Sequence, residues 1–574
     1  MLRGGPHPAL PCLDACRHSH AEGHTPPAFP ADNAVNGKPS CANDWLLKTV
    51  ARDSWGFDGY ITSDCGAVSD VYNNHHYTAT PELDVQAIMA AGTDVDCTDF
   101  VGKYAQSALD KKLITVADID ARLAMLFRVR MRLAHFDPPG PLQSIPTSAV
   151  CTSEAKALAA DGVTQGATLL KNVGKALPLE KARLKTLAVL GPNANLGKAI
   201  SSYYGGNNCG GLFPNLLTSL EAALPKGTVK YVAGVPSVMS GDTSGVAAAA
   251  TAASKADATI LVLGTDLTWA HEEHDAVGAA SAISFSAGQL ALLEAVAGNA
   301  SKPIIVITLT ATPLDLTPAL TNPKVGAVLH LGQPSVQTAG ALPIIFGTQS
   351  PAGRTIQTVY PAAYGDMISI FDFNMRPGPS VWPRPDCKGP PASCPRGTNP
   401  GRTYRFYTGK PVVEFGYGLS YTTFQYTLVS APSTLSLAPL TKLLQDTHER
   451  TGAKHFPRLA NAAHAAMYLV NVTNTGSVAA DDAVLGFLTP PGAGVGGLPL
   501  KQLFGFERVH VKPGETVQVY LYPALTDFAF AAAADGARAP LAGTYTVSFG
   551  VAAPGMGFVE APLEATMATV AEEA

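Results

Sequence analysis

The sequence has few charged residues and no long apolar run. Asp, Glu, Lys and Arg make up 15% of the 574 residues, and 40 basic side chains stand against 45 acidic ones, giving a formal net charge of −5. Nucleic-acid-binding proteins usually carry a concentrated basic surface, so this balance argues against nucleic acid as a partner. No stretch approaches the roughly 20 apolar residues of a membrane-spanning helix, so we expect no membrane contact. Residues 1–32 are polar and irregular and have no apolar run long enough for a signal peptide, so we expect none among them.

Sequence motifs for cofactors and metals are also missing. No GxGxxG fingerprint follows the first strand expected near residue 190, so an NAD- or nucleotide-dependent enzyme is disfavoured. No CxxC pair occurs together with a second pair or a His pair, which argues against zinc. Cys12 and Cys16 lie near three histidines, and we interpret them as part of an irregular leader. We therefore expect neither a cofactor nor a metal.

The nine cysteines permit disulfides but leave an odd thiol. Cys387 and Cys394 flank the turn-rich segment KGPPAS, a loop that a disulfide could close. Because the total is odd, at least one cysteine remains a thiol.

The chain is long enough for about three or four domains, and its first block has an α/β pattern. Residues 59–63 form an expected strand ending at Asp64, residues 81–91 an expected helix, and residues 92–96 a second strand. Thr115 then caps a long helix, with Asp118 at its third position. Alternating strands and helices predict parallel strands, whose carboxyl ends carry the chemistry in barrels and open sheets.

The second block continues the pattern with longer apolar strands. They are expected at residues 186–190, 258–263, 304–308 and 326–331. Ser286 and Gln289 form an expected capping box at the start of one intervening helix. Continuous apolar strands between helices predict a mostly parallel sheet that is covered on both faces.

The last block changes to short β-type runs. Residues 361–457 are rich in Pro, Gly and aromatics and are interpreted as a connector. From about residue 465, short runs separated by turns predict an all-β sandwich. The runs are residues 467–472, 483–488, 516–521 and 543–549.

Asp64 is a candidate catalytic carboxylate. A carboxylate at the end of a buried parallel strand is held rigidly and is partly desolvated, which suits a nucleophile or a general base. Aspartate in this position also caps helices, and that interpretation stays open. For Asp94 and Asp96, at the same place on the next strand, we expect loop or cap roles.

The densest ionisable cluster, His271-Glu-Glu-His-Asp275, has three interpretations. It could bind a metal, although it is not HExxH and no third ligand is identifiable. It could be a solvated loop. It could also carry a loop carboxylate that reaches a neighbouring domain's pocket, where apolar surroundings raise its pKa and make it a general acid.

Several motifs in order resemble glycoside hydrolase family 3, in its β-xylosidase/α-arabinofuranosidase branch. In the first block they are NGKPSCAN (36–43), GFDGYITSDCGAV (56–68), AGTDVDC (91–97) and RVRMRLAHFDP (128–138). Further along they are LLKN (169–172) with LPL (177–179), LGPNA (190–194), PGRTYRFY (400–407) and FGYGLSYTTF (415–424).

The resemblance implies a multidomain α/β plus all-β fold. Its parts would be an unmatched leader, part of a (β/α)8 or TIM-type barrel, an α/β sandwich, a connector and a fibronectin-III-like β-sandwich. They are expected at residues 1–32, 33–145, 152–385, 386–464 and 465–570 respectively.

The same resemblance implies a retaining glycosidase without metal or cofactor. Asp64 matches the family's nucleophile, and Glu272 best matches its acid/base, with Asp275 three residues on and Glu273 as the fallback. The implied substrates are oligosaccharides derived from xylan or other hemicellulose, or aryl glycosides, and the implied location is extracellular or the cell wall. Xylose, arabinose and glucose specificity, the substrate-binding residues and the oligomeric state stay open.

The barrel expected from the resemblance is incomplete. A (β/α)8 barrel needs about 250 residues, whereas about 100 precede the second block here. The earlier strands that hold the sugar in the family have no counterpart, so we expect an N-terminally truncated barrel. The alternative function is that of an inactive family member acting as a carbohydrate-binding or interaction protein.

Overall fold

The structure is a computed structural model that divides into two compact units. Unit 1 consists mainly of the chain up to Ile145, and unit 2 of most of the chain from Pro146 onward. The residues described are 32–197, 209, 213–267, 283–310, 312–334, 337–390, 392–451, 464–531 and 538–567. Within these ranges, no helix combines the length and apolarity needed to span a membrane.

Unit 1 is mainly helical, with two very short strands that carry the acidic residues. Thr62 and Val95 form a parallel bridge, so the two strands expected at residues 59–63 and 92–96 are parallel neighbours but shorter than predicted. The other elements are β1 (Ala34–Val35), β2 (Lys38–Pro39), η1 (Ser40–Ala42), the π-helix η2 (Trp45–Ser54), α2 (Ala67–Asn73), α3 (Pro81–Ala91), α4 (Phe100–Asp110) and α5 (Val116–Arg132).

Local sequence signals set the helix ends in unit 1. The Thr80 side chain accepts a hydrogen bond from the Leu83 amide at the start of α3, and Gly92 ends the helix with φ 109°. Thr115 and Asp118 form the predicted capping box of α5. The predicted helix over residues 81–91 and this cap are therefore confirmed.

The core of unit 1 lies between α2, α3 and α4. Val68, Val71, Val85, Ile88 and Phe100 are among its buried side chains. By contrast, none of the residues of α5 is buried among the described residues, and its apolar side chains form an exposed stripe. The most exposed large apolar side chains of α5 are those of Met131 and Val116, followed by Leu123 and Phe127.

Unit 2 contains a six-stranded sheet in the order β3-β8-β7-β6-β4-β5. All neighbours pair in parallel except the edge strand β3, which is antiparallel to β8, so the predicted mostly parallel sheet is confirmed. The strands are β3 (Thr168–Asn172), β4 (Leu187–Leu190), β5 (Val229–Val232), β6 (Ala258–Gly264), β7 (Ile304–Leu309) and β8 (Val325–His330).

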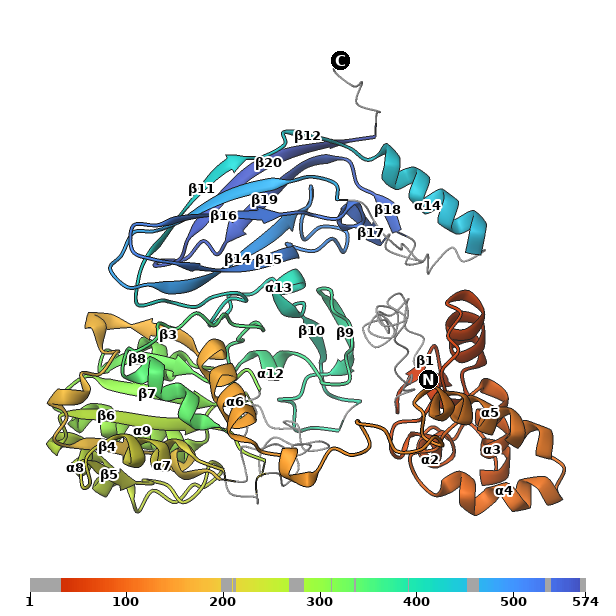
Figure 1. Cartoon of the computed structure of the whole chain (residues 1–574), viewed down its shortest axis with the longest axis horizontal. Coiled ribbons are helices and arrows are strands. Elements are labelled where there is room, and N and C mark those ends of the chain that lie inside the picture. Colours follow the sequence, from red (N-terminus) through yellow and green to blue (C-terminus); the bar gives the residue numbers. More distant parts are fainter. Residues whose placement is uncertain are drawn as a thin grey trace. The chain divides into compact units, whose positions relative to one another are not determined.

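Helices cover both faces of this sheet, as Figure 1 shows. Successive residues of a strand point to opposite faces, so Leu261 and Leu263 of β6 pack into one core and Ile260 and Val262 into the other. The helices and helical turns are η3 (Thr147–Ala149), α6 (Ser153–Gly166), η4 (Val173–Lys175), η5 (Lys181–Arg183), η6 (Pro192–Asn195), α7 (Leu216–Ala223), α8 (Val246–Lys255), α9 (Ala287–Asn299), α10 (Thr317–Thr321), η9 (Thr338–Ala341), α11 (Leu342–Ile345), α12 (Tyr364–Met367) and α13 (Thr403–Phe406).

A hairpin follows the sheet. Its strands β9 (Gly378–Pro383) and β10 (Arg396–Asn399) pair antiparallel, and Cys387 and Cys394 form the predicted disulfide in the loop between them. A second disulfide, Cys151–Cys209, was not predicted.

The C-terminal sandwich consists of a three-stranded sheet, β11-β13-β16, and a five-stranded sheet, β12-β20-β19-β14-β15. Strands β11 and β12 lie in the segment predicted as a connector. They could not be predicted, because their partner strands are more than 30 residues away and no local sequence pattern indicates them. The elements from residue 424 onward are β11 (Phe424–Ser430), β12 (Thr434–Ser436), α14 (Ala438–Thr451), β13 (Tyr468–Asn474), β14 (Ala480–Thr489), β15 (Gln502–Val511), β16 (Thr516–Leu521), η10 (Leu525–Phe528), β17 (Ala529–Ala531), β18 (Arg538–Pro540), β19 (Gly543–Gly550) and β20 (Phe558–Thr566). Of these, α14 from residue 442 on, residue 531 of β17 and residues 538–539 of β18 belong to unit 1.

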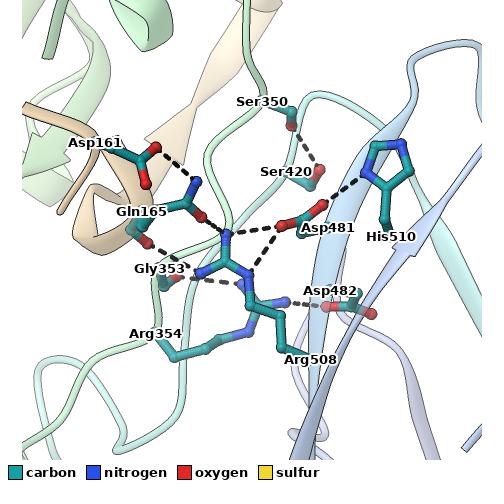
Figure 2. A network of polar contacts seen from close by, with 10 residues as sticks. All are labelled: Asp161, Gln165, Ser350, Gly353, Arg354, Ser420, Asp481, Asp482, Arg508 and His510. Carbon is teal, nitrogen blue, oxygen red and sulfur yellow. Dashed lines mark hydrogen bonds and ion pairs between the residues drawn. The ribbon is translucent and has the colours of Figure 1, made fainter. Parts of the chain in front are cut away.

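Polar contacts fix the sandwich to the first part of unit 2. Arg508 on β15 donates to the backbone carbonyl and the side-chain oxygen of Gln165 at the end of α6, and it pairs with Asp481 on β14 at 2.9 Å. His510 lies against the other oxygen of the Asp481 carboxylate, as Figure 2 shows.

Candidate functional site

Asp64 lies directly after the short strand of unit 1 that includes Ile61 and Thr62. Its side chain is exposed, and one carboxylate oxygen accepts a hydrogen bond from the Cys65 amide at 2.8 Å. Gly66 follows with φ 100° and precedes α2, a conformation that favours glycine. Asp64 is therefore presented to solvent on a sharp turn between a strand and a helix.

The residue before Asp64 is fixed to the neighbouring strand. Ser63 is fully buried, its amide donates to the Val95 carbonyl at 2.8 Å, and its hydroxyl accepts from the Cys97 amide at 3.0 Å. A disulfide between Cys65 and Cys97 ties the two strand ends together on the other side of Asp64. The backbone on both sides of the carboxylate is thus held to one neighbour.

Asp96 ends that neighbouring strand and has the cap role expected for it. One carboxylate oxygen accepts from the Thr98 amide and hydroxyl, and the other accepts from the Val101 amide in the first turn of α4. These bonds satisfy amides at the start of the helix.

Asp94 has a different environment from the loop or cap position expected. Its side chain is completely buried and accepts hydrogen bonds from Arg52, Arg122 and the backbone amide of Ile61. Asp94 does lie in a loop, but the cap role is wrong for it, because the carboxylate pairs with residues far away in sequence rather than with the helix that follows.

Two further ionisable groups lie inside unit 1. Burial raises the pKa of the Cys41 thiol to about 12, with smaller contributions from nearby aspartates that include Asp64 and Asp96. Burial also raises the pKa of Asp84 to about 7. A thiol and a carboxyl with these pKa values are both largely protonated in mildly acidic solution, so neither adds much charge near Asp64 there.

The acid/base candidates Glu272 and Glu273, together with His271, His274 and Asp275, lie outside the described residues. The strand that leads to them is β6, which ends at Gly264 with φ 148°. A Cβ at Gly264 would lie 1.9 Å from the Leu309 carbonyl oxygen, so a side chain cannot be accommodated there.

Buried amide side chains hold the end of β6. The Gln289 side chain accepts from the Gly264 amide at 2.9 Å and donates to the Gly264 carbonyl at 3.0 Å. Asn193 donates to the Thr265 carbonyl at 2.9 Å. Ser286 caps α9 as predicted, but Gln289 bonds to β6 and to Val238 instead of completing the capping box.

Asp64 is recognisable from the sequence, whereas the residues that hold its strand are not. Arg52, Arg122 and Ser63 have no local motif, because their partners lie 28 to 42 residues away. Of the three, only Ser63 lies next to an acidic strand end in the sequence. Within the described part of the chain, no group of three or more His, Cys, Asp or Glu side chains could hold a metal ion.

Three family profiles match the sequence. "Glycosyl hydrolase family 3 N terminal domain" matches residues 28–129, and "Glycosyl hydrolase family 3 C-terminal domain" matches residues 167–421. "Fibronectin type III-like domain" matches residues 482–552. The first match contains Asp64, and the second contains Glu272 and Glu273.

Curated proteins similar to this chain include plant and fungal xylosidases. "Beta-D-xylosidase 1" of Arabidopsis thaliana is 36% identical over 503 residues, which cover 85% of this chain and 61% of that protein. "Probable exo-1,4-beta-xylosidase xlnD" of Neosartorya fischeri is 37% identical over 494 residues, which cover 84% of this chain and 58% of that protein. The chain thus spans about three fifths of the length of these relatives.

Solved structures agree with this similarity. A GH3 exo-beta-xylosidase (XlnD), in complex with a xylobiose aziridine activity based probe, has a TM-score of 0.76 and 29% identity, covering 93% of this chain and 65% of that chain. A beta-glucosidase from Listeria innocua has a TM-score of 0.71 at 20% identity, covering 93% and 67%, and shares the fold.

Proposed function

Because the chain belongs to glycosyl hydrolase family 3, we propose that it hydrolyses O-glycosidic bonds with retention of configuration, and that Asp64 is the nucleophile. The observation that carries the proposal is the setting of Asp64. An exposed carboxylate stands on a strand-to-helix turn whose flanking residues, Ser63 and Cys65, are both tied to the neighbouring strand. A nucleophile needs this combination of access and fixed position.

The proposed reaction has two steps. The Asp64 carboxylate attacks the anomeric carbon while a general acid protonates the leaving oxygen, and a covalent glycosyl-enzyme forms. The same acid, now deprotonated, then removes a proton from water, which attacks the anomeric carbon and releases the sugar. The two carboxyl groups of such enzymes stand about 5 to 5.5 Å apart.

Glu272 is proposed as the acid/base, with Glu273 as the fallback. Both follow β6, whose end is fixed by Gln289 and Asn193, so the point at which their segment leaves the sheet is rigid. Of the two, Glu272 keeps the family's spacing to an aspartate three residues later, Asp275.

The proposed substrates are β-xylosides, including xylan-derived oligosaccharides, and the proposed location is extracellular or the cell wall. The names of the curated relatives support xylose over glucose, since those reported above are xylosidases. This chain spans about three fifths of those relatives. We therefore propose the activity for the chain together with the segments that would complete its barrel.

The test is hydrolysis of aryl β-xyloside, α-arabinofuranoside and β-glucoside by the purified chain, beside Asp64→Gly. We expect β-xyloside hydrolysis that Asp64→Gly abolishes. Added azide should restore turnover of that variant and give a glycosyl azide of inverted configuration, because azide takes the place of the missing nucleophile. Folded protein without activity on any substrate would favour the alternative of a non-catalytic carbohydrate-binding protein.

A second comparison assigns the acid/base. Glu272→Ala should still turn over a dinitrophenyl β-xyloside, whose leaving group needs no proton, and azide should then yield a product of retained configuration. Glu273→Ala is the matched control and should leave turnover of a poor leaving group intact. The reverse pattern would assign the role to Glu273.

A further inference from the structure

We infer that Asp94 is a positioning residue for the nucleophile: by holding the backbone of Ile61, it fixes the strand that ends in Asp64. The inference rests on the proposed role of Asp64 and adds to it a residue that does not touch substrate. It assigns a function to a buried ion network that the proposed reaction itself does not use.

The Asp94 carboxylate makes three bonds, and each is well placed. One oxygen accepts from the Ile61 amide at 2.7 Å and from Arg52 at 2.6 Å, while the other accepts from Arg122 at 2.9 Å. The Asp94 side chain is fully buried, and those of Arg52 and Arg122 are 18% and 20% exposed. Charge-assisted bonds of this length are stronger than neutral ones and are directional.

The network also holds the loop that enters the strand. Arg52 donates to the carbonyl of Gly59 at 3.1 Å and to that of Phe57 at 3.3 Å, in addition to its bond with Asp94. Arg52 therefore fixes the chain before Ile61, while Asp94 fixes Ile61 itself. Asp64 follows three residues later.

The short length of the strands explains why a side chain is needed. Thr62 and Val95 form an isolated parallel bridge, supported by backbone bonds from Asp94 and Val95 to the Ile61 carbonyl at 2.7 and 3.0 Å. Long parallel strands keep their register through many such bonds, whereas these two have few. The bond from the Ile61 amide to the Asp94 carboxylate continues the pairing where the backbone ladder stops.

Burial and the groups around Asp94 act on its carboxylate in opposite directions. Burial raises the pKa of Asp94, while the Ile61 amide and the two guanidinium groups oppose the rise. Two arginines facing one carboxylate favour its ionised form, which is the form that accepts all three bonds.

The structure offers a matched control for Asp94. Asp58, in the same loop that enters the strand, pairs with Arg132 of α5 at 2.5 Å, just as Asp94 pairs with Arg122 of α5. The side chains of Arg132 and Asp58 are 49% and 43% exposed, whereas that of Asp94 is fully buried. Asp58→Asn therefore removes a more exposed ion pair to the same helix, α5, and leaves the bond from the Ile61 amide to the Asp94 carboxylate in place.

The experiment compares wild type, Asp94→Asn and Asp58→Asn in the full chain by two readouts. The first is the rate of covalent labelling by a xylose-configured aziridine, with the labelled residue identified by mass spectrometry. The second is amide hydrogen exchange of a peptide spanning residues 58–66. All measurements are made at a temperature where each variant is folded by circular dichroism.

We expect Asp94→Asn to lower the maximal labelling rate at Asp64 by about 10- to 100-fold, since small misplacements of a reacting group cost rates of this order. The concentration for half-maximal labelling should change little, because Asp94 does not touch the ligand. Exchange in residues 58–66 should accelerate, and Asp58→Asn should match wild type in both readouts.

Two results would overturn the inference: labelling of Asp94→Asn at the wild-type rate, or unchanged exchange in residues 58–66. If wild type itself is not labelled at Asp64, the proposed function fails, and the exchange measurement alone decides whether Asp94 holds the strand. Should Asp94→Asn not fold, Arg52→Lys is the second variant, because it removes the bonds to Gly59 and Phe57 while keeping a charge near Asp94. It should accelerate exchange in the same peptide.

Discussion

The Arg354 guanidinium forms an ion pair with the Asp482 carboxylate inside unit 2, and this contact links the chain that follows the parallel sheet to β14 of the sandwich. The two side chains are 10% and 1% exposed. The Tyr426 hydroxyl donates to the other oxygen of Asp482 at 2.7 Å, and Arg354 also donates to the Gly418 carbonyl at 2.9 Å. Figure 2 shows this pair beside the more exposed contacts of Asp481.

Asp482→Asn should strongly destabilise unit 2. Removing one partner of a buried ion pair leaves the other charge uncompensated, at a cost of about 3–5 kcal/mol. The measurement is the free energy of unfolding in urea, followed by fluorescence.

The neighbouring residue gives the control. Asp481→Asn breaks the pair with Arg508, whose side chain is 35% exposed, and exposed pairs contribute about 0–1 kcal/mol. If the two substitutions lower the free energy of unfolding by the same amount, the prediction that the buried pair contributes more than the exposed pair is wrong.

Because of Asp84, the free energy of unfolding of unit 1 should be higher in acid than at neutral pH. Its side chain is fully buried, and burial outweighs the hydrogen bond with the Tyr72 backbone, which opposes the rise of its pKa. Burial raises its pKa from the usual 3.8 to about 7, so the folded state keeps the proton that the unfolded chain loses near pH 4. The free energy of unfolding should therefore decrease as the pH rises from about 4 to about 7, by up to about 4 kcal/mol.

Asp84→Asn, which cannot ionise, tests this directly. We expect it to raise the stability of unit 1 at pH 7.5 and to have a much smaller effect at pH 4, as measured by hydrogen exchange of peptides from α3. Asp120→Asn, on the exposed side of α5, should leave the pH dependence unchanged. A pH dependence that survives in Asp84→Asn would assign it to another group.

Because of His330, unit 2 should lose stability as the pH falls, which is the opposite of the effect of Asp84 on unit 1. Burial at the end of β8 lowers its pKa from 6.5 to about 4, and its Nδ1 lies 2.9 Å from the Thr308 hydroxyl. The unfolded chain binds a proton below pH 6.5 that the folded state refuses until about pH 4. Unfolding should thus become easier as the pH falls through this window, by up to about 3 kcal/mol.

The comparison is between His330→Asn and His510→Asn. The first variant should lose most of the acid-induced decrease in the urea midpoint of unit 2. The second removes an imidazole that is 58% exposed and should keep that decrease, because His330 is still present. Parallel curves for wild type and His330→Asn would refute the assignment.

Local signals explain which parts of the fold could be predicted. Thr115 with Asp118 announces the start of α5, and the apolar stretch of β6 announces a buried strand, because both depend on residues that are close in sequence. Asp94 shows the opposite case: its partner Arg52 is 42 residues away, so the sequence offers only the general preference of aspartate for caps.

The candidate site follows the same division. Asp64 was predictable from its place after a short apolar strand and from the motif around it. Its surroundings were not, because the Ser63 bond to Cys97 and the disulfide between Cys65 and Cys97 join segments more than 30 residues apart. Pairing of distant segments depends on the fold as a whole and leaves no local pattern.

The disulfide Cys65–Cys97 should stabilise the fold and also hold the Asp64 carboxylate in position. It closes a loop with a sequence separation of 32, and loss of such a crosslink costs about 3–4 kcal/mol in the chain-entropy description. We expect the double variant Cys65→Ala/Cys97→Ala to show faster hydrogen exchange in residues 58–66 and slower covalent labelling at Asp64.

The hairpin disulfide Cys387–Cys394 is the matched control, because its sequence separation is only 7. Replacing this pair by alanine should destabilise less, since a short loop loses less entropy on closure, and it should leave the labelling of Asp64 unchanged. If both double variants label at the wild-type rate, the crosslink beside Asp64 contributes only to stability. The hydrogen bonds of Ser63 and Asp94 would then be sufficient to hold the carboxylate in place.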